Sequence, residues 1–113
     1  MRYKELADAI RRGAKMRPQG FGSMAHQLND GTSCALLAMI EGLYGRPRSY
    51  AALTQLQPYK LPMAEEIYNK NDILRMTREQ IADWLDSLEE PSESDSDWAT
   101  RKVAEVTRVK EAA

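Results

Sequence analysis

The segment CALLAMIEGL, residues 34–43, constrains the fold more than any other part of the chain. Nearly all of its residues are apolar, and a helix that is apolar on all sides has to be surrounded by other helices. Either Thr32 or Ser33 can cap its first turn, and a glycine and a proline follow its end. We therefore expect a central helix over about residues 33–44, with Cys34, Leu37 and Ile40 in the core.

The strongest local helix signal is TREQIADWLDSLE, residues 77–89. Thr77 and Gln80 have the spacing of a capping box, in which each side chain bonds the other residue's backbone amide. Apolar residues then recur at i, i+3, i+4 and i+7, so they share one face of the helix. That face is expected to pack on the central helix, and its members are Ile81, Trp84, Leu85 and Leu88.

Helical spacing also covers residues 3–16 and a short segment capped by Ser49. Pro62 suits the first position of another helix, which the pair at 71–72 (Asn-Asp) is expected to break. Residues 18–32 contain three glycines and indicate a loop with one short turn. No segment alternates apolar and polar residues as a half-buried strand does. The predicted fold class is therefore all-α, a compact single-domain bundle of five or six helices.

The bulk composition is that of an ordinary globular domain. The chain has 113 residues, 42% of them hydrophobic, and a formal net charge of −1. The start of the chain lacks the apolar run of a signal peptide, and no apolar stretch is long enough to span a bilayer. A single cysteine rules out an internal disulfide framework. These features predict a cytoplasmic protein without a membrane partner.

The sequence divides into three regions. Residues 1–90 form the predicted helical core domain, and residues 91–97 form an acidic, Ser-rich connector. Residues 98–113 are predicted to form an amphipathic helix with an apolar stripe that contains three valines. Because valine lowers helix propensity, this helix should need a surface to pack on, either the core or a second subunit.

Cys34 is the first candidate for chemistry, because a thiol near a helix N-terminus can have a lowered pKa. A cysteine nucleophile also needs a base, and the only histidine, His26, lies in a different segment without a recognised motif. Free cysteine is among the most buried residue types, and three apolar residues follow this one. Core packing is the favoured interpretation, so no catalytic residue is predicted and the protein is expected not to be an enzyme.

Metal and cofactor sites are not predicted either. One cysteine and one histidine cannot complete a structural zinc shell without carboxylates, and no ligand-spaced cluster exists. The segment NKND, residues 69–72, is too short and too poor in acids for a calcium loop. Gly20 and Gly22 follow no strand and precede no Gly-Lys-Ser/Thr, so they do not form a phosphate-binding loop.

Charge is unevenly distributed along the chain. Residues 1–18 hold six basic residues, whereas residues 86–97 hold six acids and no base, so these two blocks can attract each other within the molecule. Basic residues also occur in the C-terminal helix. The candidate interaction surface predicted from this pattern consists of Arg11, Arg12, Lys15, Arg101, Lys102 and Arg108.

DNA binding is the alternative function. The helix over 77–89 is similar to the first helix of many helix-turn-helix motifs, and the basic helix over 98–112 would be the reading helix. Such motifs join their helices by three or four residues. Here the connection is longer and acidic, and it would repel phosphates. A nucleic-acid partner is therefore disfavoured.

Three short motifs carry a resemblance to known sequences. Cys-Ala-Leu at 34–36, Asn-Asp at 71–72 and Thr-Arg-Glu-Gln-Ile at 77–81 resemble small uncharacterised proteins of bacterial and phage genomes. The resemblance covers roughly residues 33–88 and implies no activity and no site residues. The leading hypothesis is therefore a non-enzymatic interaction protein, bacterial or phage-encoded, that binds another protein or self-associates.

Overall fold

The computed structural model describes residues 2–89, and the predicted connector and C-terminal helix lie outside these residues. Within them the chain is all-α, as predicted, and its only β-type pairing is an isolated bridge between Gln19 and Ser33. The elements in chain order are α1 (Tyr3–Ala14), α2 (Met24–Asp30), α3 (Ala35–Tyr44), α4 (Tyr50–Gln55), the 3-10 helix η1 (Pro58–Lys60), α5 (Ala64–Asp72) and α6 (Arg78–Ser87).

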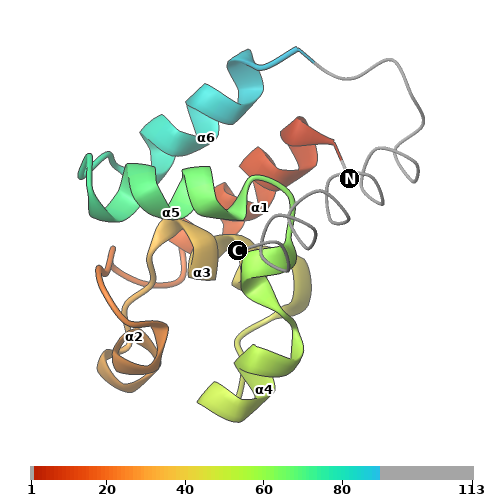
Figure 1. Cartoon of the computed structure of the whole chain (residues 1–113). Helices are drawn as coiled ribbons and strands as arrows, with labels where there is room; N and C mark the ends of the chain where they lie inside the picture. Colours follow the sequence, from red (N-terminus) through yellow and green to blue (C-terminus); the bar gives the residue numbers. More distant parts are fainter. Residues whose placement is uncertain (1, 90–113) are drawn as a thin grey trace, which may run out of the picture.

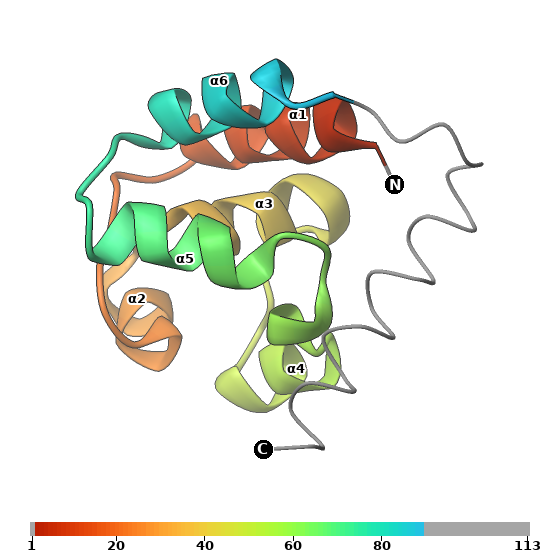
Figure 2. The same ribbon diagram turned by 45° about the horizontal axis from the view of Figure 1, so that its top comes forward.

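The apolar helix α3 lies at the centre of the fold, as its sequence predicted. α1 and α6 lie side by side on one side of it, α5 runs along another, and α2 and α4 lie at the far end from α6 (Figures 1 and 2). Every residue from Ala35 to Ile40 is fully buried. Residues 2–89 contain no helix that is long and apolar enough to cross a bilayer.

α1 and α3 touch through their backbones. A Cβ atom added to Gly13 would lie 2.0 Å from the carbonyl oxygen of Ala38, and one added to Gly42 would lie 2.0 Å from that of Ala9. The two pairs run in opposite directions along the helices, so the crossing is antiparallel. The sequence marked Gly13 only as a weak point of its helix, whereas the structure shows that contact with α3 requires a glycine there.

The start of α3 differs from the prediction. Its N-cap is Cys34, whose sulfur accepts a hydrogen bond from the backbone N–H of Leu37 at 3.4 Å, and neither Thr32 nor Ser33 caps the helix. The bridge explains why, because the N–H of Ser33 donates to Pro18 and its carbonyl accepts from Gly20. These bonds hold Ser33 outside the helix.

Side chains from two other helices complete the start of α3. The N–H of Cys34 donates to Oε1 of Gln27 at 2.7 Å, and the N–H of Ala35 donates to Oδ1 of Asn71 at 2.9 Å. Both amide side chains are fully buried. Nδ2 of Asn71 also donates to the carbonyl of Gly20 at 3.1 Å. The N–H groups of Cys34 and Ala35 are therefore satisfied by long-range contacts, whereas that of Leu37 is satisfied by the local cap at Cys34.

The bounds of α5 also differ from the prediction. Pro62 is not the first helical residue, because Met63 adopts a left-handed backbone (φ 62°) and the helix starts at Ala64. Asn71 and Asp72 are the last residues of α5 and do not break it. Their side chains bond to residues outside α5, namely Ala35, Gln19, Gly20 and Gly22, which keeps the end of this helix ordered.

The capping box of α6 is present, with both hydrogen bonds between Thr77 and Gln80 formed. Ile81 and Leu85 are fully buried. Trp84 and Leu88 are half-buried at the edge of the core, and the ammonium group of Lys70 lies 4.4 Å from the centre of the Trp84 ring. The predicted face of α6 is therefore buried at its middle and partly exposed at its margin. It packs mainly on α1, so the prediction that it packs on the central helix is wrong.

We predict that Gly42→Ala destabilises the protein. Helix propensity alone would favour alanine by about 0.5–1 kcal/mol, but the added methyl group meets the backbone of Ala9 and must push α1 away from α3. Overpacking of this kind costs roughly 1–3 kcal/mol or more. Urea unfolding measures the sign, and a stabilised variant would contradict the close crossing.

We predict that Asn71→Leu destabilises the protein much more than Asn69→Leu. The first change leaves the buried N–H of Ala35 without its acceptor, and an unsatisfied buried donor costs about 1–3 kcal/mol. Asn69 is an exposed residue of the same helix, where a substitution is usually worth less than about 0.5 kcal/mol. Thermal unfolding of the two variants compares them directly, and equal melting temperatures would contradict the role given to Asn71.

Candidate functional site

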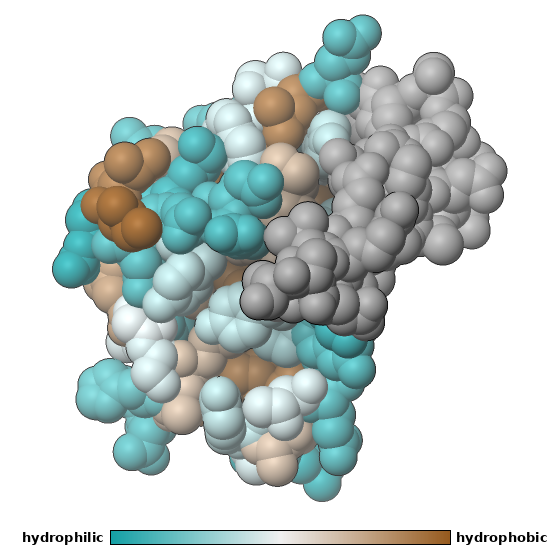
Figure 3. Space-filling view, in the orientation of Figure 1, coloured by the Kyte–Doolittle hydropathy of each residue, from teal (hydrophilic) through white to brown (hydrophobic). Residues whose placement is uncertain are grey.

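A groove of about 480 Å³ is lined by residues of α2, α4 and η1. Its apolar members Met24, Leu53 and Pro58 are buried. Tyr50 and Tyr59 also line it and are 53% and 46% exposed. The remaining lining residues are polar: Ser23, Thr54, Gln57 and Lys60. In Figure 3 apolar surface is visible in a hollow over α4, with paler side chains around it.

Local backbone geometry builds the wall of the groove. Ser49 caps α4 by accepting a hydrogen bond from the N–H of Ala52 at 3.1 Å. Gln57 then adopts a left-handed backbone (φ 50°), and Pro58 opens η1 directly after it. A non-glycine residue rarely adopts this conformation, and such residues gather at binding and catalytic sites.

Tyr59 is held by an aromatic contact with α5. Its ring meets that of Tyr68 edge to face, with centroids 6.2 Å apart. Burial, together with a hydrogen bond to Asp72, raises the pKa of Tyr68 to about 12. Burial also raises the pKa of Tyr59. Both phenols are therefore neutral at physiological pH. Each offers an apolar ring and a hydroxyl group that can form hydrogen bonds.

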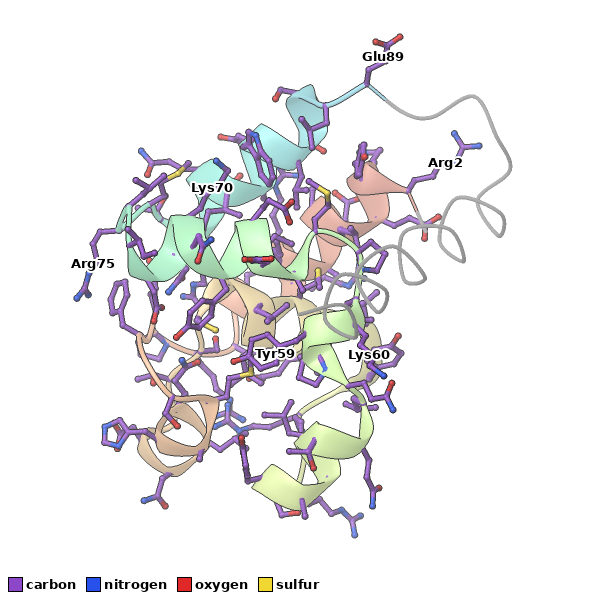
Figure 4. All side chains as sticks on the ribbon, viewed as in Figure 1. Arg2, Tyr59, Lys60, Lys70, Arg75 and Glu89 are labelled. Carbon is purple, nitrogen blue, oxygen red and sulfur yellow. The ribbon has the colours of Figure 1, made fainter. Side chains whose placement is uncertain are left out.

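The chemistry of the groove is set by its described lining residues. Its lining contains hydroxyl and amide groups and one amine, that of Lys60, and it includes no carboxylate, thiol or imidazole. Figure 4 shows Tyr59 and Lys60 near the middle of the molecule, on η1. Apolar floor residues with a few polar groups around them are typical of sites that hold an apolar group of a ligand.

Cys34 and His26 have different environments. The cysteine is fully buried, and burial raises the pKa of its thiol. The His26 side chain is 70% exposed, and its Nε2 lies 2.8 Å from a carboxylate oxygen of Asp30 in the same helix. The thiol is thus a packed core group that also caps α3, as its apolar surroundings in the sequence suggested.

Arg11, one of the predicted surface residues, binds carboxylates of its own chain. Its guanidinium contacts Asp86 at 2.7 Å, Asp83 at 2.8 Å, Glu79 at 3.0 Å and Asp8 at 3.3 Å. The hydrogen bonds to Asp86 and Glu79 raise the pKa of Arg11. Of the predicted acidic block only Asp86 takes part in this contact between α1 and α6, and residues 90–97 of that block lie outside the described residues.

Of the other predicted basic residues, the structure describes Arg12 and Lys15. Arg12 donates two hydrogen bonds to the carbonyl of Gly42, at 3.1 and 3.2 Å, and Lys15 is exposed at the end of α1. Arg101, Lys102 and Arg108 lie outside the described residues. Arg11 therefore pairs with α6, and Arg12 bonds to α3.

Three more arginines hold buried polar groups. The carboxylate of Glu41, which is buried in α3, lies 2.8 Å from Arg46 and 3.3 Å from Arg17. Arg78 donates to the hydroxyl of Ser33 at 2.8 Å and to the carbonyl of Arg17 at 2.7 Å. These contacts tie loops to the core and leave no buried side-chain polar atom unpartnered among the described residues.

Within residues 2–89 no three His, Cys, Asp or Glu side chains are placed to hold a metal ion. The helix α6 exposes Glu79 and Asp83 on its outer side. These carboxylates would repel DNA phosphates at the helix that the DNA-binding alternative uses, and the second helix of that alternative lies outside the described residues.

Comparisons of the chain with protein-family models, curated proteins and solved structures gave no match. The class of the molecule is therefore defined by its own fold and site, as an all-α domain with an apolar groove between α2, α4 and η1.

Sequence reasoning did not identify the groove residues as a site. The sequence predicts only a short helix capped by Ser49 in this part of the chain. The segment QPYKLP, residues 57–62, did carry one signal, because two prolines around an aromatic residue indicate an irregular backbone that ordinary core helices lack.

We predict that native Cys34 reacts slowly with iodoacetamide and reacts like a free thiol in urea. Burial raises its pKa, so the thiolate needed for reaction forms at a higher pH in the folded than in the unfolded chain. Mass spectrometry over a pH series measures the labelling. Rapid labelling of the folded protein at neutral pH would contradict the buried thiol.

Proposed function

We propose that this protein is a non-enzymatic interaction protein, and that the groove between α2, α4 and η1 binds a segment of another protein. The observation that carries the proposal is the groove itself, which places two exposed tyrosines beside a buried apolar floor. Tyrosine is enriched at the residues that dominate binding energy in protein interfaces. The volume of about 480 Å³ is within the range of ligand-binding sites.

The chemistry of the lining defines the class of partner. A buried floor of Met24, Leu53 and Pro58 accepts aliphatic or aromatic side chains. The hydroxyl groups of Ser23 and Thr54 at the rim can form hydrogen bonds with polar groups of the partner that flank its apolar side chains. A helix with one apolar stripe meets both requirements, because its i, i+3, i+4 positions enter the floor while its polar positions face the rim.

Support for a non-enzymatic role comes from the state of the reactive groups. The thiol of Cys34 is sealed in the core and the pKa shift opposes its ionisation. The neighbouring carboxylates of Asp83 and Asp86 both pair with Arg11. We propose the bacterial cytoplasm as the compartment, in a bacterium or a phage-infected cell, because the chain has one cysteine and no disulfide framework.

Site-specific photo-crosslinking tests the groove in living cells. A photoreactive residue replaces Thr54, which lines the groove, or Gln55, which is exposed on the same helix and does not line it. We expect one protein to be captured at position 54 and not at position 55. Equal capture at both positions, or none at position 54, would count against a groove partner.

The captured protein, once purified, allows a quantitative prediction. Tyr59→Ala removes a rim aromatic ring, whereas Tyr44→Ala removes an exposed ring that does not line the groove. Loss of a dominant interface residue costs more than about 1–2 kcal/mol, so we expect the first variant to bind roughly tenfold or more weakly. Calorimetry measures both affinities, and an unchanged affinity of Tyr59→Ala would contradict the proposal.

A further inference from the structure

A second feature bears on the groove, namely the amino-acid sequence that follows the described residues. The sequence continues from Glu89 to residue 113, and the part over 98–112 has the pattern of an amphipathic helix. Its apolar stripe contains Val103, Val106 and Val109, with Trp98 at its start. An isolated helix of this length with three valines is marginal in water, so it needs an apolar surface to pack on.

The length of the connector limits where this segment can dock. Residues 89–98 can span roughly 30 Å when extended, at about 3.3–3.6 Å per residue. The longest dimension of the molecule is 38 Å. Figure 4 shows Glu89 at one end of the molecule and Tyr59 nearer its middle. This span is of the same order as the dimensions of the molecule, so docking on the same chain is the arrangement that we consider.

Charge is also complementary. Residues 98–112 contain four basic and two acidic residues and are therefore positively charged overall. The basic residues are Arg101, Lys102, Arg108 and Lys110, and the acidic ones are Glu105 and Glu111. Glu65 and Glu66 are exposed in the first turn of α5, which contacts η1. These two carboxylates follow the groove wall closely in the chain and can pair with the basic residues of the segment.

A second apolar surface exists but fits this segment less well. Ile73 and Leu74 are strongly exposed at the connection between α5 and α6, where Figure 3 shows a brown patch. The guanidinium of the next residue, Arg75, lies 4.2 Å from the centre of the Phe21 ring. This patch is a projecting loop with Arg75 beside it, and none of its residues lines the groove. The groove also has one cation in its lining, Lys60, but Glu65 and Glu66 of α5 outnumber it.

We propose that residues 98–112 dock in the groove of their own chain and cover it until a partner protein displaces them. The apolar stripe then rests on Met24, Leu53 and Pro58, and the basic side chains approach Glu65 and Glu66. The covering role rests on the proposed function, because only a groove that binds a partner can be regulated in this way. The docking itself does not depend on any partner.

Tryptophan fluorescence of the full chain tests the docking. The chain has two tryptophans, so Trp84→Phe leaves Trp98 as the only one. We expect a blue-shifted Trp98 emission that acrylamide quenches weakly. Adding Thr54→Arg places a long cation in the groove and should shift the emission to the red and increase quenching. Adding Gln55→Arg, on the same helix outside the groove, should change neither.

Several outcomes would overturn the docking. A water-like emission of Trp98 in the unaltered groove shows that the segment is free, and an equal response to both arginine substitutions shows that it packs elsewhere. Protection that is lost on dilution, together with a dimer in light scattering, assigns the segment to a second copy of the chain. If Thr54→Arg lowers the melting temperature, Tyr59→Ala replaces it, with Tyr44→Ala as the control.

A failure here is distinguishable from a failure of the proposed function. If Trp98 is exposed but position 54 still captures a partner, the groove binds without a covering segment. If Trp98 is protected by the groove and no partner is captured at position 54, the docking stands and the groove serves the chain's own segment alone.

Discussion

The contact between the backbones of α1 and α3 is the constraint on which the rest of the fold depends. Gly13 and Gly42 let the two helices approach until a methyl group no longer fits between them. At this separation Arg12 reaches the carbonyl of Gly42, and Ala9 and Ala38 complete the crossing. The central helix then keeps its remaining sides for α5 and for contacts with Gln27 of α2 and Arg78 of α6.

The start of the central helix is buried, and this burial includes the thiol of Cys34. A helix N-terminus attracts negative charge, but here Gln27 and Asn71 occupy its first amides and the sulfur of Cys34 takes the next. Neutral acceptors thus fill the place where a thiolate or an anionic ligand would bind. The arrangement stabilises the helix and keeps the thiol buried, with its pKa raised by that burial.

Short sequence patterns predicted those helices and caps that depend on residues close together in the chain. The apolar run in α3, the capping box of Thr77 and Gln80, and the cap at Ser49 each depend on residues a few positions apart, and the structure contains all three. The errors concern distant partners. Ser33 does not cap because Pro18 and Gly20 bond to it, and Asn71 continues its helix because Ala35 and Gly20 bond to it. The groove was missed for the same reason, since its lining comes from three separate segments and no short motif joins them.

The position of the groove follows from the same division of the molecule. α1, α3 and α6 are joined by many contacts, whereas α2 and α4 meet only loosely. α4 is short, and the left-handed Gln57 and two prolines turn the chain before it can pack as a longer helix. Apolar side chains such as Leu53 are therefore held by the core on one side and face the groove on the other. The exposed tyrosines beside this surface add rings that a docking segment can bury, and burial of apolar surface is the driving force of the binding role that we propose.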